Sequence, residues 1–292
     1  MADRTRIEWT DATWNPITGC SVVSPGCTNC YAMRLAGTRL RHHPTRAGLT
    51  RDTRAGPVWT GEVRLNEAAL MQPLHWKRPR RIFVCAHGDL FHESVPDEWI
   101  DKVFARMALA PQHTFQVLTK RTRRMRGYIE NAIARVANAI RPLRTDTRAV
   151  GPLPHLDGGE RWWPLANVHL GTSVEDQPRA DERIPDLLAT EAAVRFVSAE
   201  PLLQTLDLGS YVGRSIFGID SDHTPELLVP FPRLDWVIVG GESGPGARPM
   251  HPDWARSLRD QCVAAGVPFF FKQMARKAPI PADLMIREFP DA

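Results

Sequence analysis

The sequence lacks any long hydrophobic run, which excludes the membrane-spanning class of protein. No stretch of the 292 residues approaches the roughly 18 consecutive apolar residues that a membrane helix needs. The first residues, MADRTRIEWTD, contain no apolar core of the kind found in a secretory signal peptide. We therefore expect a cytoplasmic protein with no membrane partner.

The sequence is also poor in lysine and in net charge. Lysine accounts for five of the 37 basic residues, and the 33 acidic residues leave a formal charge of +4. A net charge of +4 over 292 residues is weak support for a nucleic-acid partner. A GC-rich genome would produce the same preference for arginine over lysine. The hydrophobic fraction of 43% and the charged fraction of 24% are typical of a globular protein. We expect residues 1–292 to form a single domain.

Cysteine is scarce and its count is odd. Cys20, Cys27 and Cys30 lie within eleven residues, whereas Cys85 and Cys262 stand alone. An odd number of cysteines without a secretion signal argues against a disulfide framework. It favours cytosolic thiols or a metal site.

Seven short apolar runs, each ending abruptly in polar residues, indicate a parallel sheet. They are rich in Val, Ile and Phe and show no alternation, as strands buried on both faces do. These runs are Val63–Leu65, Ile82–Cys85, Phe115–Leu118, Val168–Leu170, Val194–Val197, Trp236–Val239 and Pro268–Phe271. The helix-like stretches are Thr28–Leu40, Glu67–His75, Pro96–Ala110, Arg123–Ile140, Ile184–Leu188 and Pro252–Ala265.

The repeated alternation of strand and helix predicts an α/β protein with a full or partial (β/α) TIM-like barrel; an open sheet is the alternative. An eighth strand before Cys20 would have to come from Ala12–Ile17, a poor strand candidate. Two long insertions, at about 141–165 and 206–233, are rich in Pro, Gly and charge. Loops of this length are usually lids, binding loops or disordered insertions.

Polar side chains follow six of the predicted strands at the point where each strand ends. Because chemistry in parallel α/β folds collects at these carboxyl ends, the six loops together predict one pocket. For any single residue, a structural role such as a helix cap or a surface ion pair is as well supported. The candidate residues are Asp89, His92, Lys120, Arg121, Glu175, Glu200, Gly240, Gly241, Glu242 and Lys272.

The three clustered cysteines are spaced C-x₆-C-x₂-C on one loop, and Pro25 and Gly26 allow that loop to turn tightly. Three thiolates can hold a [4Fe–4S] cluster with one open iron, or a structural zinc completed by His42 or His43. A third alternative is that the cysteines are buried and hold nothing. A zinc site normally has a second pair of ligands, which is missing here, so the spacing favours the cluster.

A three-cysteine loop ahead of a run of βα units resembles the radical S-adenosylmethionine (radical SAM) superfamily. More closely, the chain is similar to a phage-associated, bacterially widespread family of uncharacterised three-cysteine, radical-SAM-like proteins. The matching segments are Ile7–Thr10, Thr13–Pro16, Gly19–Ala32, Asp89–Glu93, Leu118–Arg121, Ser173–Asp176, Ser198–Leu202, Val239–Ser243 and Phe271–Gln273.

The resemblance implies a chemistry. Cys20, Cys27 and Cys30 would hold three irons, and the fourth iron would chelate SAM. Reductive cleavage, which requires an electron donor, would then release a 5′-deoxyadenosyl radical that acts on a substrate. By the same resemblance, Glu242 on its Gly-Gly-Glu turn would bind the SAM ammonium, and Tyr31 follows the last cysteine beside the cofactor. The other strand-end residues would form the substrate pocket.

Two other functions are compatible with the residues. The first is a nucleic-acid-binding module stabilised by zinc, supported by the basic runs His75–Arg81 and Lys120–Arg126. The second is a redox iron–sulfur protein that never cleaves SAM. The sequence favours a radical SAM-type enzyme over both of these functions. It indicates neither the substrate nor the oligomeric state.

Overall fold

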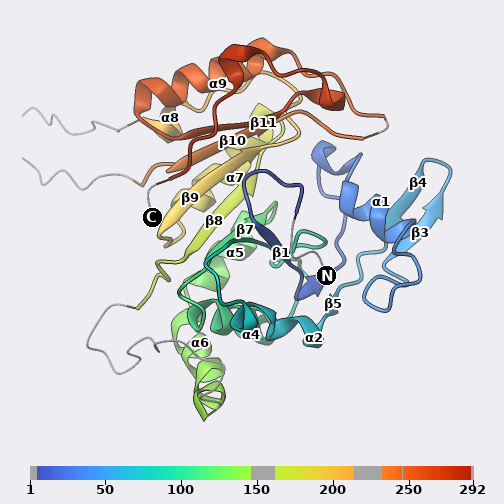
Figure 1. Cartoon of the computed structure of the whole chain (residues 1–292), viewed down its shortest axis with the longest axis vertical. Coiled ribbons are helices and arrows are strands. Elements are labelled where there is room, and N and C mark those ends of the chain that lie inside the picture. The colour runs from blue at the N-terminus through green and yellow to red at the C-terminus, as the bar shows by residue number, and fades with distance from the viewer. Residues whose placement is uncertain (1–4, 146–161, 214–231, 245, 291–292) are drawn as a thin grey trace, which may run out of the picture.

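The computed structural model describes residues 5–145, 162–213, 232–244 and 246–290. Seven parallel strands form the central sheet in the order β1-β6-β7-β8-β9-β10-β11, and the sheet curls into a half-barrel (Figure 1). The predicted α/β class is confirmed in its partial TIM-like form. The strands are β1 (Ala12–Trp14), β6 (Arg81–Val84), β7 (Thr114–Thr119), β8 (Val168–Ser173), β9 (Val194–Ala199), β10 (Trp236–Gly240) and β11 (Phe269–Gln273).

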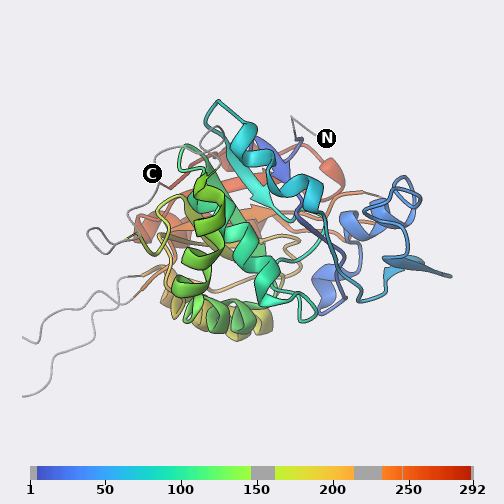
Figure 2. The ribbon, with the colours of Figure 1, turned by 90° about the horizontal axis from the view of Figure 1, so that it is seen from below.

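Helices cover the convex face of this sheet (Figures 1 and 2). They are α4 (Asp97–Ala108), α5 (Thr122–Ile129), α6 (Ala132–Ile140), α7 (Gln177–Leu188) and α9 (Pro252–Ala265), with shorter helices α2 (Glu67–Leu70), α3 (Gln72–His75) and α8 (Gly209–Val212). Strand side chains such as Val84, Val117 and Leu170 pack with these helices in the main hydrophobic core. No helix in the described ranges is long and apolar enough to cross a membrane.

The concave face of the sheet carries a layer of aromatic side chains. Phe83, Phe196, Trp236 and Phe270 from four strands pack around Trp9, and the centroids of the Trp9 and Phe83 rings lie 4.8 Å apart. Side chains on one face of a strand recur every second residue. The next concave positions beyond Phe196 and Phe270 are Ser198 and Lys272, so polar groups follow the aromatic layer toward the carboxyl ends.

Two of the strand predictions were wrong. Val63–Leu65 contributes β5 (Arg64–Leu65), which pairs antiparallel with β2 (Ile17–Thr18) outside the central sheet. The segment Ala12–Ile17, which its sequence makes a poor strand candidate, supplies β1, whose Ala12 and Trp14 are fully buried. A strand of three residues is too short to show a recognisable hydrophobic run. Its burial follows from its pairing with the neighbouring β6, which its own sequence pattern does not reveal.

Four of the helix predictions needed new boundaries. Thr28–Leu40 contains only α1 (Tyr31–Gly37), and Glu67–His75 is two short helices, α2 and α3. Arg123–Ile140 is two helices, α5 and α6, separated at Glu130–Asn131. Helix α7 begins at Gln177, well before the predicted Ile184, because the Asp176 side chain accepts a hydrogen bond from the Arg179 backbone N–H. Helix α9 has its predicted bounds, and Gly266 follows it in the left-handed conformation.

A small lobe, residues 31–60, projects from the side of the half-barrel (Figures 1 and 2). We call it the hairpin lobe. It contains α1 (Tyr31–Gly37) and an antiparallel hairpin of β3 (Thr50–Thr53) and β4 (Gly56–Trp59). The sequence did not predict the hairpin, because the run TRDTRAGPVW is largely polar. The lobe's own core is Ala32, Met33, Ala36, Leu49 and Trp59.

The two predicted insertions fall mainly outside the described residues. From the first, the structure describes a 3₁₀ helix, η2 (Arg141–Thr145), and residues 162–165. From the second, it describes residues 206–213, including α8, and residues 232–233. The prediction that these segments are lids or binding loops therefore stays a prediction.

Candidate functional site

A cavity of about 200 Å³ opens at the carboxyl ends of the parallel strands, bounded on one side by the cysteine loop. This is the edge of the sheet at which α/β folds of this kind place their sites. The structure brings most of the predicted site residues to this one cavity. Its lining includes Cys20, Cys27, Cys30, Tyr31, Asp89, Lys120, Arg121, Glu200, Glu242 and Lys272.

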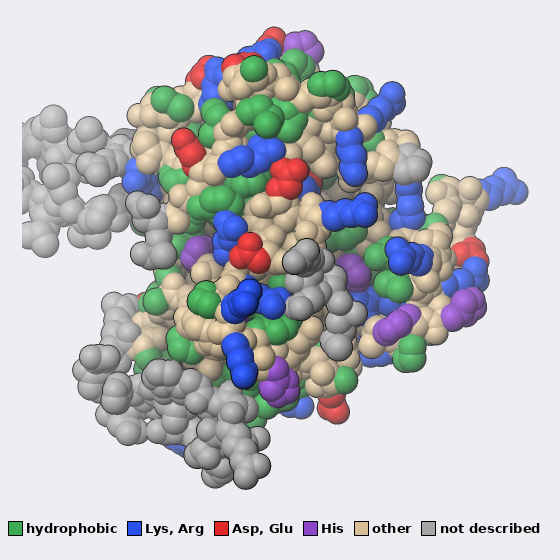
Figure 3. Space-filling view, viewed as in Figure 1, with side chains coloured by type: hydrophobic (Ala, Val, Ile, Leu, Met, Phe, Trp, Pro, Cys, Tyr) green, Lys and Arg blue, Asp and Glu red, His purple; other side chains and the backbone are tan. Residues whose placement is uncertain are grey.

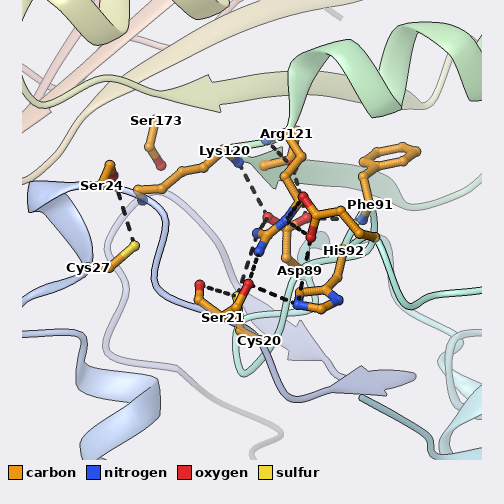
Figure 4. Close-up of polar contacts among 12 residues, drawn as sticks. Cys20, Ser21, Ser24, Cys27, Asp89, Phe91, His92, Lys120, Arg121 and Ser173 are labelled. Carbon is orange, nitrogen blue, oxygen red and sulfur yellow. Dashed lines mark hydrogen bonds and ion pairs between the residues drawn. The ribbon is translucent and has the colours of Figure 1, made fainter. Parts of the chain in front are cut away.

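The pair formed by Asp89 and Arg121 is the most connected part of the lining (Figure 4). Arg121 Nη1 lies 2.9 Å from Asp89 Oδ2, and both side chains are almost fully buried. The guanidinium also donates through Nε to Glu93, and through Nη1 to the Cys20 sulfur at 3.7 Å. These acidic partners raise the pKa of Arg121 although burial opposes them. Arg121 is therefore a fixed positive charge beside the cysteine loop.

Asp89 lies in the loop after β6 and is held by neutral donors as well. Its Oδ1 accepts from the Thr119 hydroxyl at 2.8 Å and from the Phe91 backbone N–H at 3.0 Å. Its Oδ2 accepts from the Lys120 backbone N–H. With all these bonds made, the carboxylate joins the ends of β6 and β7 and is poorly placed to act as a base.

Ser21 connects the cysteine loop to His92. The hydroxyl oxygen accepts from Arg121 Nη2 at 2.6 Å and lies 3.0 Å from His92 Nε2. Because His92 Nδ1 accepts from the Ser94 backbone N–H, the ring proton sits on Nε2 and is donated to Ser21. Burial and the Arg121 charge lower the pKa of His92. Neutral His92 thus supports the loop from behind, and it does not line the cavity.

Glu175 is fully buried and also lies behind the loop. It accepts a hydrogen bond from the Gly26 backbone N–H at 3.1 Å and pairs with Arg183 at 3.1 Å. Burial raises the pKa of this carboxyl, but the Ser24 hydrogen bond, the charges of Arg183 and Lys120 and the Gly26 hydrogen bond together hold it below its usual range. A Cβ atom on Gly26 would lie 3.0 Å from the Glu175 carboxyl carbon, so a larger residue there would have to push the carboxylate away.

Glu242 lines the cavity and holds the other end of the loop. Its Oε2 accepts from Asn29 Nδ2 at 2.8 Å, and Arg248 donates to both carboxylate oxygens. These bonds lower the pKa of Glu242 although burial raises it. Two further predicted residues, Gly240 and Gly241, do not reach the cavity. A Cβ on Gly241 would lie 2.2 Å from the Ala275 backbone nitrogen, so this glycine serves close packing.

Lys272 and Glu200 form an ion pair across the ends of β11 and β9. Lys120, by contrast, makes no side-chain hydrogen bond or ion pair with any residue that the structure describes. Its side chain extends toward the Ser24–Cys27 segment (Figure 4), and its charge lowers the pKa of Cys30 against a larger rise from burial. The cavity therefore holds one paired and one unpaired ammonium.

The three clustered cysteines are free thiols, each partly exposed, that face this common cavity. Burial, with a contribution from Asp89, raises the pKa of Cys20 to about 12. Within the described ranges, no three His, Cys, Asp or Glu side chains converge closely enough to hold a single metal ion. His42 and His43, considered as a fourth zinc ligand, are exposed. Tyr31 is half exposed, and its hydroxyl donates to the Ala86 carbonyl at 2.6 Å.

Four residues that hold this site were not predicted: Ser21, Asn29, Arg183 and Arg248. Asn29 and Ser21 act by long-range contacts, Asn29 with Glu242 across 213 positions of the chain and Ser21 with Arg121 across 100, whereas Arg183 and Arg248 pair with glutamates 8 and 6 positions away. Ser21 and Asn29 were within reach of sequence reasoning because each directly adjoins a cysteine of the loop. The two arginines carry no such signal in this sequence.

Comparison with known proteins yields a family and no described function. No curated protein and no solved structure matches the chain significantly. One family model matches residues 4–283, nearly the whole sequence. The chain therefore belongs to the family described as "Protein of unknown function (DUF5131)".

Proposed function

We propose that this protein is a radical SAM-type enzyme whose cysteine loop binds a [4Fe–4S] cluster through Cys20, Cys27 and Cys30. The observation that carries the proposal is that all three thiols face one cavity at the carboxyl end of a parallel half-barrel. The resemblance to the phage-associated radical-SAM-like family adds support. This is a more specific function than family membership alone gives.

The donor set suits a cluster better than a single ion. A four-iron cluster takes one thiolate per iron, so its cysteines need not converge on one point. The described residues include no convergent group of three or more donors. Arg121 donates to the Cys20 sulfur, and such hydrogen bonds to ligand sulfurs stabilise the thiolate form and tune a cluster.

Cys20, Cys27 and Cys30 would hold the cluster, and the chemistry supplied would be the one-electron reductive cleavage of SAM to methionine and a 5′-deoxyadenosyl radical, with the electron coming from a donor protein. The protein supplies orientation and charge around this chemistry. The unpaired Lys120 ammonium, which lines the cavity, would bind a carboxylate or phosphate, and Glu200 of the Lys272 pair would accept from an ammonium. Glu242, already bonded to Asn29 and Arg248, would chiefly hold the loop.

The first test is the composition of the anaerobically purified protein. We expect a brown protein with about four iron and four sulfide per chain by the composition of the cluster, and with no zinc. Incubation with SAM and dithionite should then yield 5′-deoxyadenosine. A colourless protein loaded with zinc would overturn the proposal and favour the zinc-stabilised alternative. A cluster without 5′-deoxyadenosine would favour the redox iron–sulfur protein.

Substitution of the cysteines separates the proposed ligands from the other thiols. Cys20→Ala, Cys27→Ala and Cys30→Ala should each lose most of the iron and abolish 5′-deoxyadenosine formation. Cys262→Ala is the matched control, because Cys262 is buried on α9 away from the cavity. It should retain the iron content and the activity of the unaltered protein. Full iron in all three loop variants would refute the assigned ligands.

A further inference from the structure

The positive charge of the chain is concentrated in the hairpin lobe. Residues 31–60 contain six arginines and a single acidic residue, Asp52, which gives the lobe a net charge of +5. The whole chain carries +4, so the remainder is close to neutral. The small overall excess therefore conceals a strongly basic segment of thirty residues.

Most of these arginines are displayed on the surface of the lobe (Figure 3). Arg39, Arg41, Arg51 and Arg54 are exposed, together with His42 and His43. Arg41 pairs with Asp52 at 2.8 Å. Arg39, Arg51 and Arg54 have no side-chain hydrogen bond or ion pair within the described part of the chain. Nothing in the fold itself requires these three charges.

The hairpin lobe is attached to the cysteine loop and so to the cavity. Cys20 and Cys30 pack against the lobe's hydrophobic core, and Trp59 at the end of β4 belongs to that core and also lines the cavity. Tyr31, which begins α1, lines the cavity with its ring half exposed. A long ligand bound along the lobe would thus pass directly beside the candidate site.

The chemistry of the lobe fits a polyphosphate chain. The exposed cations of the lobe, Arg39, Arg41, Arg51 and Arg54, are all arginines, whose planar guanidinium binds phosphate oxygens in pairs. The lobe beyond Tyr31 has no exposed large hydrophobic side chain, which a segment inserting into a bilayer would carry. The half-exposed Tyr31 ring is suited to stacking against a base, as aromatic side chains do in proteins that bind single strands.

We propose that the hairpin lobe binds the phosphate backbone of a nucleic acid and that the substrate in the cavity is a nucleotide unit of that strand. The first part depends on the lobe alone. The second part rests on the proposed function, since it gives the substrate class for the same cavity. Backbone contacts of this kind position a strand without reading its sequence.

The test measures binding of a fluorescein-labelled 20-nucleotide single strand, as DNA and as RNA, by fluorescence anisotropy between 50 and 300 mM salt. The unaltered protein should bind with an affinity that falls steeply with salt, because phosphate contacts release counterions. R51E/R54E should weaken binding about tenfold or more and flatten the salt dependence. R51Q/R54Q should act in the same direction with a smaller effect, in case charge reversal disturbs the hairpin.

K77E/R78E is the matched control. It reverses two exposed cations that precede β6, at the end of the sheet opposite the cavity, and it should leave affinity within about twofold of the unaltered protein. Equal losses in this control and in R51E/R54E would show that binding follows net charge and would overturn the proposal. So would binding to vesicles of anionic phospholipid with none to either strand.

The two proposals fail in different ways. Strand binding through the lobe without 5′-deoxyadenosine formation would leave the lobe assignment standing and reject the radical function. SAM cleavage without strand binding would do the reverse. If both hold, adding the strand should raise the rate of 5′-deoxyadenosine formation in the unaltered protein but not in R51E/R54E.

Discussion

The buried carboxylate of Glu175 accepts a hydrogen bond from the backbone N–H of Gly26, 149 positions earlier in the chain. Glu175 follows β8, and Gly26 lies in the loop between Cys20 and Cys27. The cysteine loop is thus anchored to the central sheet from behind. Similar anchors reach it from Arg121 through Ser21 and from Glu242 through Asn29. The shape of the loop is fixed by the half-barrel before any ligand binds.

Replacing Glu175 by Gln should weaken the anchor of this loop, because the amide has one acceptor oxygen for Gly26 and Arg183 where the carboxylate has two. The substitution leaves the Arg183 guanidinium buried without its counter-charge, which typically costs about 3–5 kcal/mol. Urea denaturation followed by circular dichroism would measure the loss of unfolding free energy. Iron content after anaerobic reconstitution should fall as well. Unchanged stability with full iron loading would show that the anchor is dispensable.

Replacing Gly26 by Ala should lower the free energy of unfolding, because the buried ion pair with Arg183 holds the Glu175 carboxylate where the new Cβ would press on it. The new Cβ would lie 3.0–3.2 Å from the Glu175 carboxylate atoms, and such overpacking costs about 1–3 kcal/mol. Gly127→Ala provides the control, since a Cβ there would meet no atom within 4 Å. Inside α5 that change should stabilise the protein by about 0.5–1 kcal/mol. Thermal melts that shift in opposite directions would confirm the argument.

The Asp89–Arg121 pair should behave as one unit in a double-mutant cycle. Arg121→Met leaves Asp89 buried and uncompensated, and we expect a loss of about 3–5 kcal/mol. The double variant with Asp89→Asn should cost about 1–3 kcal/mol less than the sum of the two single changes, because the partners are in direct contact. Denaturation of all four proteins gives the coupling energy. Strict additivity would contradict a specific pair.

His169 should make the fold sensitive to mild acid. Its Nδ1 is buried with no hydrogen-bond partner in the described structure, and burial lowers the pKa of the ring to about 4. The unfolded chain takes up a proton near pH 6.5, whereas the folded chain does not. Stability is therefore complete above pH 6.5 and is lost as the pH falls toward 4.

The matching variant is His169→Gln, which removes this titration. Between pH 6.5 and 4.5 the unaltered protein should lose about 2–3 kcal/mol more stability than the variant. Urea denaturation at four pH values across this range would measure the difference. Parallel curves for the two proteins would mean that His169 is already protonated or solvated in the folded state.

Local pattern was enough to predict most of the sheet. Runs such as Phe115–Leu118 and Trp236–Val239 are apolar throughout because both faces of a central parallel strand are buried, and they lie within β7 and β10. The same reasoning missed β1 and the β3–β4 hairpin. A three-residue strand has no visible period, and the polar hairpin is held by packing of Trp59 against α1.

The features of the candidate site likewise divide into those that the sequence predicted and those that only the structure revealed. The sequence by itself determined the three-cysteine loop and the polar strand ends, because spacing along the chain places them at one edge of a parallel sheet. Only the tertiary structure decided that Asp89 and Arg121 form a buried pair, and that Glu175 and His92 support the loop instead of facing the cavity. Such roles depend on which donor meets each carboxylate or ring nitrogen, and those partners lie far away in the sequence.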